Sequence, residues 1–328
     1  MVGTPGGLLR GEVAEMMSTP AQAPLDECGV LCRGLTKDYG QGHGLFDLDL
    51  DIDRGEVFGF VGPNGAGKTT TIRLLMDLIR ADRGTATILG LDSRRDSRAV
   101  KRRVGYLPGE LPAFPGVSAG YVVGLLAGLR GGVDRARIAA LAQRLDLDLS
   151  RRYQSLSHGN KQKVHLVQAF MHSPEVLILD EPTLGLDPLV QREFRTLVAE
   201  AAAGGATVLL SSHVLAEVEL ICDRIGLIRE GRLLRVGSME QLRTVRAHRV
   251  EALVRDPGEA RDLAAVRGVS DAAVDDRLVT CTVHGDIGPL LAFLSGWQVT
   301  ELDSRELSLE EVFVTEFAGA PRAWARDE

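Results

Sequence analysis

A glycine-rich segment, 62–69, has the residue types and spacing of a phosphate-binding loop. It reads Gly62-Pro63-Asn64-Gly65-Ala66-Gly67-Lys68-Thr69 and matches the pattern G-x-x-x-x-G-K-T. Glycines let backbone N–H groups close around phosphate oxygens, because no Cβ stands in the way. Lys68 supplies a point charge for the terminal phosphates, and the Thr69 hydroxyl is a ligand for Mg²⁺. The sequence therefore predicts a nucleoside triphosphate site at these residues and at Thr70, which follows them.

Two acids at the end of an apolar run, Asp180 and Glu181 after 176–179, predict hydrolytic chemistry. In a phosphate-loop protein an Asp at the tip of the neighbouring strand holds Mg²⁺, usually through water, and the next carboxylate orients or deprotonates the attacking water. His213 lies shortly after a second apolar run, 207–210. Ligands bind at the carboxyl ends of such strands, so we expect the imidazole to meet a γ-phosphate.

A third polar segment, 156–163, opens a predicted helix that runs to about Met171. It reads Leu156-Ser157-His158-Gly159-Asn160-Lys161-Gln162-Lys163. The Ser157 hydroxyl and the free N–H groups of the helix start form a second anion site. One chain with one triphosphate has no need for a second phosphate-facing helix end, whereas two chains facing each other would use it.

The hydrophobic pattern predicts the elements that must position these groups. A buried strand, 57–61, leads into the glycine-rich loop, and a helix begins at Thr70. The runs 176–179 and 207–210 are typical of central parallel strands, with a helix over 192–203 between them. Further strands are expected at 30–39, 46–52, 86–89 and 104–107, a hairpin at 224–236 around Glu230-Gly231, and a helical insert over 113–172.

The composition changes after about Glu240, and this predicts a separate α+β domain. Strands are expected at 250–254, 278–283 and 297–300, helices at 259–266 and 287–295, and an amphipathic segment at 308–317. The predicted organisation is a flexible leader at 1–27, a nucleotide-binding domain at 28–240 with its helical subdomain at about 110–172, an accessory domain at 241–320 and a tail at 321–328.

Charge and composition narrow the class of protein. The net charge of −7 argues against nucleic acid as the main partner. The apolar run 121–129 is short and ends at Arg130, so we expect a buried helix rather than a membrane span. The start of the chain has no secretory pattern. The four cysteines form no C-x-x-C motif and are expected to be reduced thiols in a cytosolic protein.

Taken in order and spacing, these motifs resemble the ATP-binding subunit of an ABC transporter over about 30–237. The resemblance makes Leu156–Asn160 the signature motif, Gly185-Leu186-Asp187 the D-loop and His213 the switch histidine, and puts Tyr39 against adenine. It implies an α/β phosphate-loop fold with a RecA-like core, an antiparallel β subdomain and a helical subdomain, and ATP and Mg²⁺ as cofactors. It also implies a head-to-tail homodimer or heterodimer in which each phosphate loop faces the partner's signature motif.

Two departures from the family pattern stand out. The signature motif has His158 and Asn160 where the commonest form has Gly and Gln, while Ser157 and Gly159 remain. Gly109 stands where many relatives have a Gln that reaches Mg²⁺ and the attacking water. Glu110 is the candidate for a partial substitute, and the strength of coupling between ATP and a membrane subunit is the property that this change affects.

The chain is also similar to bacterial drug and antibiotic exporters of the daunorubicin-resistance type, which have ABC-2 type permeases. The similarity rests on 57–61, 106–108, 182–188 and 309–313. It implies efflux of a small hydrophobic compound, at the cytoplasmic face of the bacterial plasma membrane, through a separate permease that contacts about 113–131. The accessory domain would stabilise the dimer or regulate it. The cargo is not specified, because its contacts lie in the permease.

Two other functions stay open. A soluble ABC ATPase of translation or DNA repair is disfavoured, because this chain has one cassette and only about ninety residues without heptads between phosphate loop and signature motif. A cassette that binds ATP mainly as a gate, with weak hydrolysis, is motivated by Gly109.

Overall fold

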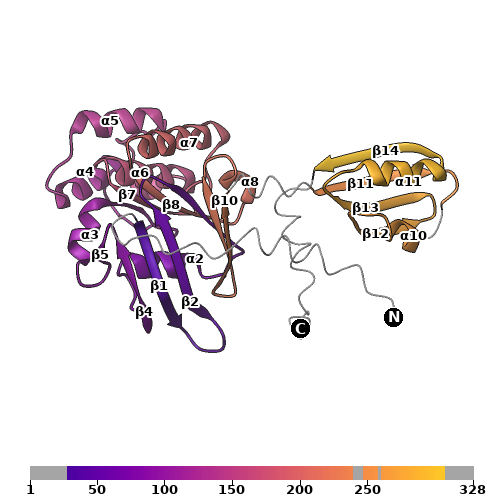
Figure 1. Cartoon of the computed structure of the whole chain (residues 1–328). Coiled ribbons are helices and arrows are strands. Elements are labelled where there is room, and N and C mark those ends of the chain that lie inside the picture. The colour runs from indigo at the N-terminus through magenta and orange to yellow at the C-terminus, as the bar shows by residue number, and fades with distance from the viewer. Residues whose placement is uncertain (1–27, 239–246, 258–259, 307–328) are drawn as a thin grey trace. The chain divides into compact units, whose positions relative to one another are not determined.

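The computed structural model describes residues 28–238, 247–257 and 260–306. The chain divides into two compact units, Met1–Ser238 and Met239–Glu328, and each is described by itself (Figure 1). The predicted leader 1–27, the amphipathic segment 308–317 and the tail 321–328 lie outside the described residues.

A six-stranded sheet forms the centre of the first unit, in the order β10-β9-β3-β8-β7-β6. Its strands are β3 (Val57–Val61), β6 (Val104–Leu107), β7 (Val176–Asp180), β8 (Thr207–Ser212), β9 (Arg224–Arg229) and β10 (Arg232–Ser238). All neighbours are parallel except the β9–β10 hairpin. Every residue of β3, β7 and β8 is buried, as the continuous apolar runs predict for strands covered on both faces.

A second, antiparallel sheet has the order β2-β1-β4-β5. Its strands are β1 (Cys28–Asp38), β2 (Gly44–Asp53), β4 (Arg83–Ile88) and β5 (Leu91–Asp92). In β2 the apolar residues Leu48, Leu50 and Ile52 are buried, and Asp47, Asp49 and Asp53 are exposed. This alternation has the period of two that places one face of a strand in the core. The sheet supplies one side of the main hydrophobic cluster.

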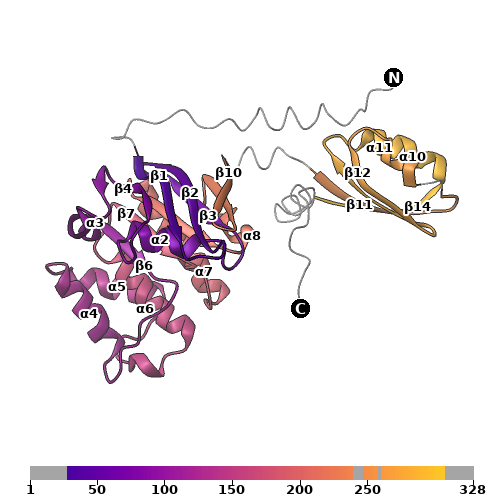
Figure 2. The same ribbon diagram turned by 90° about the horizontal axis from the view of Figure 1, so that it is seen from below.

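Helices cover the central sheet and form a separate group beyond it. They are α2 (Lys68–Leu75), α3 (Ser97–Arg103), α4 (Ala119–Leu129), α5 (Arg135–Arg144), α6 (His158–Phe170), α7 (Pro188–Ala203) and α8 (Leu215–Val218), with a short 3₁₀ helix η1 (Tyr153–Ser155). In both ribbon views α4, α5 and α6 gather on the side away from β1 and β2 (Figures 1 and 2). This arrangement gives the core, β subdomain and helical subdomain that the sequence predicts; α3 is an element that it missed.

The prediction of a buried helix over 121–129 is wrong for one face of α4. Val122, Val123 and Ala127 are buried, but Tyr121, Leu125 and Leu129 are exposed, Leu129 to 77%. The three exposed residues are spaced by four and therefore share one helix face. No helix in the described ranges is long and apolar enough to cross a membrane.

The second unit has the strand and helix order β-α-β-β-α-β. Its elements are β11 (Ala247–Val254), α10 (Ala260–Ala264), β12 (Val269–Asp275), β13 (Leu278–His284), α11 (Gly288–Leu294), the 3₁₀ helix η2 (Ser295–Trp297) and β14 (Val299–Glu306). The antiparallel sheet order β12-β13-β11-β14 is the ferredoxin-like topology. The sequence missed β12, and the strand expected at 297–300 begins two residues later, because Trp297 belongs to η2.

Candidate nucleotide site

The glycine-rich loop connects the central strand β3 to helix α2. Gly65 and Gly67 have φ angles of 80° and 108°, in the left-handed region that favours glycine. A Cβ on Gly62 would come 2.2 Å from the Ile228 carbonyl oxygen. Gly67 caps α2 without any side-chain hydrogen bond, so the N–H groups of the first turn remain available to donate to another partner.

Lys68 lies inside this loop and is only 6% exposed. Its Nζ donates to the carbonyl oxygens of Gly62 at 2.6 Å and Pro63 at 3.2 Å. Glu181 Oε1 lies 3.3 Å from the same nitrogen. The cation is therefore held over the loop by three oxygens, in the position from which it would meet phosphate.

The turn of the β9–β10 hairpin supports the loop from one side. The Gly231 N–H donates to the Ala66 carbonyl oxygen at 2.9 Å, and the Gly231 carbonyl oxygen accepts from the Phe46 N–H at 2.7 Å. Sequence analysis predicted the hairpin from Glu230-Gly231 but not this contact. Of the other predicted loop residues, Pro63 and Asn64 are exposed, whereas Thr69 and Thr70 are half-buried in the first turn of α2.

Asp180 ends β7 and is fully buried, at 0% exposure. Its Oδ1 accepts a hydrogen bond from Ser211 Oγ at 2.6 Å, and Ser211 Oγ accepts from the Glu181 N–H at 3.0 Å. Asp180 Oδ2 has no hydrogen-bond partner among the described residues. Ser211 is not among the predicted site residues, although a serine that continues a buried apolar strand is a signal for this contact.

Glu181 brings the three predicted catalytic residues together. Its φ of 49° turns the backbone out of the strand. Oε2 lies 2.8 Å from His213 Nδ1, while Oε1 faces Lys68. The three side chains come from α2 and from the segments that follow β7 and β8, and they meet at the carboxyl ends of the central strands, as predicted.

Oxygen atoms in this region fit a hard cation. Asp180 offers a buried carboxylate oxygen without a hydrogen-bond partner, and Thr69 offers a hydroxyl on the neighbouring helix. Carboxylate and hydroxyl oxygens are the ligands that Mg²⁺ takes in proteins. The residues present therefore fit the metal that the motif predicts.

Gly109 lies against this carboxylate. A Cβ at residue 109 would stand 2.8 Å from Asp180 Oδ2. The suggestion that Glu110 substitutes for the missing Gln is not supported, because Glu110 is 88% exposed and its Oε1 pairs with Arg73 Nη2 at 3.2 Å. Burial, and then the negative charge of Asp180, raise the pKa of nearby Tyr106 to about 12.

The predicted signature residues form the start of α6. Ser157 caps the helix, and its Oγ accepts from the N–H of Asn160 at 3.3 Å and from Asn160 Nδ2 at 3.0 Å. A Cβ on Gly159 would stand 2.2 Å from the Gly185 carbonyl oxygen, and a Cβ on Gly185 would meet the His158 ring at 3.0 Å. The signature motif therefore packs directly on the predicted D-loop of the same chain.

Some predicted residues are not joined to the phosphate loop. Asp187 caps α7, accepting from the Leu189 and Val190 N–H groups at 3.1 and 3.0 Å. Tyr39 is exposed, with Lys37 Nζ 5.7 Å from its ring centroid. Within the described part of the chain, neither these residues nor 157–160 form a hydrogen bond or ion pair with 62–69.

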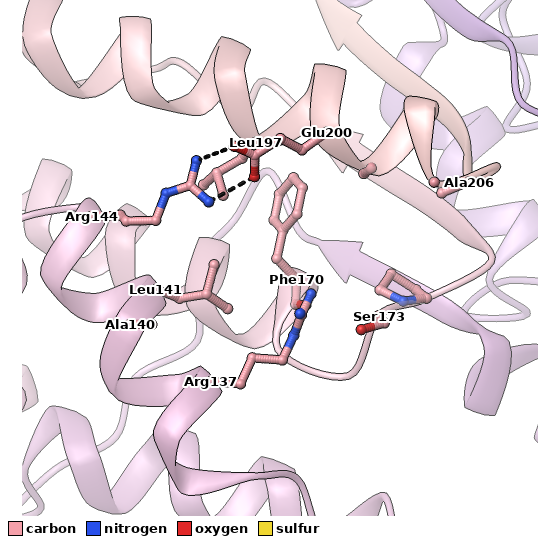
Figure 3. A pocket seen from close by; sticks show the side chains of 12 residues that line it. Arg137, Ala140, Leu141, Arg144, Phe170, Ser173, Leu197, Glu200 and Ala206 are labelled. Carbon is pink, nitrogen blue, oxygen red and sulfur yellow. Dashed lines mark hydrogen bonds and ion pairs between the residues drawn. The ribbon is translucent and has the colours of Figure 1, made fainter.

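A pocket of about 360 Å³ lies elsewhere, between α5, the end of α6 and α7 (Figure 3). Arg144 of α5 bridges to α7, donating to Glu193 at 2.5 Å and to Glu200 at 2.7 and 2.9 Å. Arg137 Nη2 donates to the Phe170 carbonyl oxygen at 3.2 Å. None of the residues that line this pocket belongs to the predicted nucleotide site.

The sheet, the glycine-rich loop and the grouping of Lys68, Asp180 and Glu181 define a phosphate-loop nucleoside triphosphatase. A family model described as "ABC transporter" matches residues 45–184. The chain is 33% identical over 307 residues to the daunorubicin resistance ATP-binding protein DrrA2 of Streptomyces coeruleorubidus, covering 88% of this chain and 95% of that protein. The chain belongs to the ABC transporter ATP-binding family and is an ATPase of that family.

Other relatives agree with this assignment. The bacitracin transport ATP-binding protein BcrA of Enterococcus faecalis is 32% identical, over 85% of this chain and 93% of that protein. A solved ATP-binding subunit of an ABC transporter is 32% identical with a TM-score of 0.60, covering 65% of this chain and 91% of that chain. A dimeric ATP-binding cassette with ADP and Pi, 22% identical with a TM-score of 0.59, covers 64% and 98% and supports the fold alone.

Proposed function

We propose that the chain is the ATP-hydrolysing subunit of an exporter that moves a small hydrophobic drug or antibiotic through a separate ABC-2 type permease. The relatives named for daunorubicin resistance and bacitracin transport support a drug or an antibiotic as the cargo. The exposed apolar face of α4 supports a permease contact at 113–131. The subunit would then work at the cytoplasmic face of the bacterial plasma membrane.

In this proposal ATP binds across the start of α2. The N–H groups within 62–70, of which Pro63 has none, surround the phosphates, and Lys68 exchanges the Glu181 carboxylate for phosphate oxygen. Tyr39, exposed on the turn between β1 and β2, stacks on adenine. Thr69 would hold Mg²⁺ directly and Asp180 would hold it through water, and the bound ion would neutralise phosphate charge.

Glu181 is the proposed general base, and its contacts carry the proposal. One carboxylate oxygen faces Lys68 at 3.3 Å and the other faces His213 at 2.8 Å. When phosphate takes Lys68, Oε1 becomes free to accept a proton from the attacking water, while His213 keeps the carboxylate oriented. In this proposal His213 also contacts the γ-phosphate.

The second half of the site comes from another chain. Ser157, His158, Gly159 and Asn160 of the partner face the phosphates, and Asp187 approaches the same interface, in a homodimer or heterodimer. Support comes from the geometry of α6, which presents a capped helix start that forms no hydrogen bond or ion pair with 62–69 among the described residues.

The test of this mechanism is Glu181→Gln. We expect ATP affinity to be kept or raised, because Lys68 loses a competing carboxylate, and steady-state turnover to fall by about 100-fold or more. ATP should also trap a dimer, measured by sedimentation. Glu200→Gln, an exposed Glu on α7, is the matched control and should turn over normally. Wild-type turnover in Glu181→Gln would exclude Glu181 as the base.

A second candidate function, an ATP-gated cassette with weak hydrolysis, is favoured by Gly109. No side chain of residue 109 covers Asp180 Oδ2, and Glu110 faces Arg73 instead. The steady-state rate of the purified wild-type chain separates the two functions. A rate far below about 1 s⁻¹, the lower end of ordinary enzymes, would favour the gate.

A further inference from the structure

A cluster of three rings, of which two are buried and Phe114 is half-buried, lies in the helical subdomain, outside the hydrolytic site. The Tyr153 hydroxyl and His165 Nε2 are hydrogen-bonded at 2.8 Å, and both residues are buried. The Phe114 ring meets Tyr153 edge-on at 5.2 Å and stacks on His165 at 6.4 Å. The proposed hydrolytic mechanism uses none of these side chains.

The three rings belong to three segments that lead to different parts of the first unit. His165 belongs to α6, the helix that Ser157 caps. Tyr153 lies in η1, four residues before Ser157. Phe114 lies between β6 and α4, in the segment that begins beside Asp180 at Gly109 and ends at the exposed apolar face of α4. The cluster therefore joins the signature motif to the segment that connects the nucleotide site with α4.

Backbone hydrogen bonds tie two of these segments together. The Tyr153 N–H donates to the Val117 carbonyl oxygen at 2.9 Å, and the Ala119 N–H donates to the Arg151 carbonyl oxygen at 2.9 Å. We therefore expect a displacement of the segment that precedes α4 to displace η1 as well. The contact of η1 with α6 is different in kind, because it runs through side chains: the His165 hydrogen bond, and Lys161 Nζ 5.7 Å from the Tyr153 ring centroid.

The chemistry of the pair suits a fixed orientation. Burial lowers the pKa of His165 to about 4 and raises the pKa of Tyr153 to about 12, so both side chains are neutral at physiological pH. A neutral imidazole has one donor and one acceptor nitrogen. A single directional hydrogen bond between two buried side chains fixes how η1 is rotated against α6, which apolar contacts alone would not.

We propose that the Tyr153–His165 hydrogen bond, packed by Phe114, is a positioning device for the signature serine. It holds Ser157 at the angle at which a second chain's ATP meets it, and it passes displacements of 108–118 to that serine. The inference rests on the proposed function, in which Ser157 completes the site of a partner chain.

Tyr153→Phe tests this directly, because it removes one oxygen and keeps the ring. In the full-length Glu181→Gln chain, we expect the ATP concentration that gives half-maximal dimer to rise about tenfold, equivalent to about 1.4 kcal/mol. Binding of a fluorescent ATP analogue to dilute, monomeric chain should not change. Ser150→Ala, which removes an exposed hydrogen-bonded hydroxyl from the same subdomain, is the control and should leave dimerisation unchanged.

A series of His165 variants separates positioning from stability. Tyr153→Phe and His165→Leu each leave one buried polar atom unpaired, so both should lower the melting temperature. The double variant removes both polar atoms and should recover the melting temperature, but not ATP-driven dimerisation. His165→Gln keeps a hydrogen-bonding group for Tyr153, and it should therefore dimerise more readily than His165→Leu. Dimerisation that follows the melting temperature through the whole series would overturn the inference.

The parent chain separates this inference from the proposed function. If Glu181→Gln stays monomeric with saturating ATP, the two-chain site is wrong, and the positioning role is overturned with it. If Glu181→Gln dimerises and Tyr153→Phe dimerises equally well, the proposed function stands and the positioning role alone is overturned.

Discussion

Two helix starts in the first unit meet phosphate in the proposed function, and they are capped in opposite ways. Helix α2 begins after Gly67, which makes no side-chain cap. Helix α6 begins after Ser157, whose Oγ accepts two hydrogen bonds from Asn160. At α2 the backbone N–H groups are the donors on offer. At α6 the cap already uses one N–H, and what the serine still offers is its own hydroxyl proton.

The two helix starts also differ in charge. Lys68, the first residue of α2, is buried beside the loop carbonyls. The buried lysine of α6 is Lys163, and its partners lie outside the helix start. Its Nζ donates to the Asp146 carbonyl oxygen at 3.3 Å and lies 3.9 Å from Asp187 Oδ2. In the proposed function, α2 therefore supplies most of the affinity for ATP, whereas α6 acts through its orientation toward the ATP of a second chain.

The largest expected effect is at α2. Lys68→Ala removes the buried cation and leaves Glu181 with its contact to His213. A hydrogen bond to a charged group contributes about 1.5–3 kcal/mol, so ATP affinity should fall roughly 10- to 100-fold by calorimetry. Lys101→Ala, on α3, is the control. Unchanged affinity in Lys68→Ala would remove α2 as the main source of binding.

The next effect concerns the backbone at α6. Gly159→Ala places a Cβ 2.2 Å from the Gly185 carbonyl oxygen, so the signature motif must move away from the D-loop. We expect ATPase activity to fall at least about tenfold and the melting temperature to drop, as an overpacked site costs about 1–3 kcal/mol. Gly124→Ala in α4 is the matched control: it meets open space and should stabilise the helix by about 0.5–1 kcal/mol.

A smaller effect is expected from the cap itself. Ser157→Ala removes the oxygen that Asn160 donates to, at a cost of about 1 kcal/mol in unfolding free energy. ATP-driven dimerisation should weaken, and ATP affinity of the single chain should not. If Ser157→Ala weakened single-chain affinity as much as Lys68→Ala does, the two helix starts would not have separate roles.

How much of this was visible in the sequence depends on the range of the interaction. The phosphate loop, the Asp180–Glu181 pair and the β9–β10 hairpin were predictable, because each is a local pattern with its own chemistry. The contacts of Ser211 were not, since they appear only when β7 and β8 lie side by side. The exposed face of α4 was missed because an unbroken apolar run has no period that distinguishes inside from outside.

The smallest effect sharpens the comparison through pH. Burial lowers the pKa of His165, within α6, to about 4, and burial followed by the charge of Arg130 does the same for His172, just after α6. In the unfolded chain the two imidazoles take up a proton near pH 6.5, whereas in the folded chain they take it up only near pH 4. Stability is therefore lost as pH falls through this window and is unaffected above it.

For His165 the loss should be about 1 kcal/mol at pH 6 and grow at lower pH. His165→Gln should show a correspondingly flatter fall in melting temperature between pH 7.5 and 5.5. Equal slopes for wild type and variant would mean that folding does not lower the pKa of His165.

The exposed face of α4 has a consequence for handling the isolated subunit. Tyr121, Leu125 and Leu129 expose apolar side chains to water on one face of α4 in the isolated subunit. Concentrated preparations should therefore form aggregates that a mild detergent disperses. The amount of aggregate should depend neither on ATP nor on the residue at position 68. Colloidal attraction of this kind adds to the dimer signal in any sedimentation experiment, so ATP-dependent dimerisation is best measured as the difference between Lys68→Ala and wild type at one protein concentration.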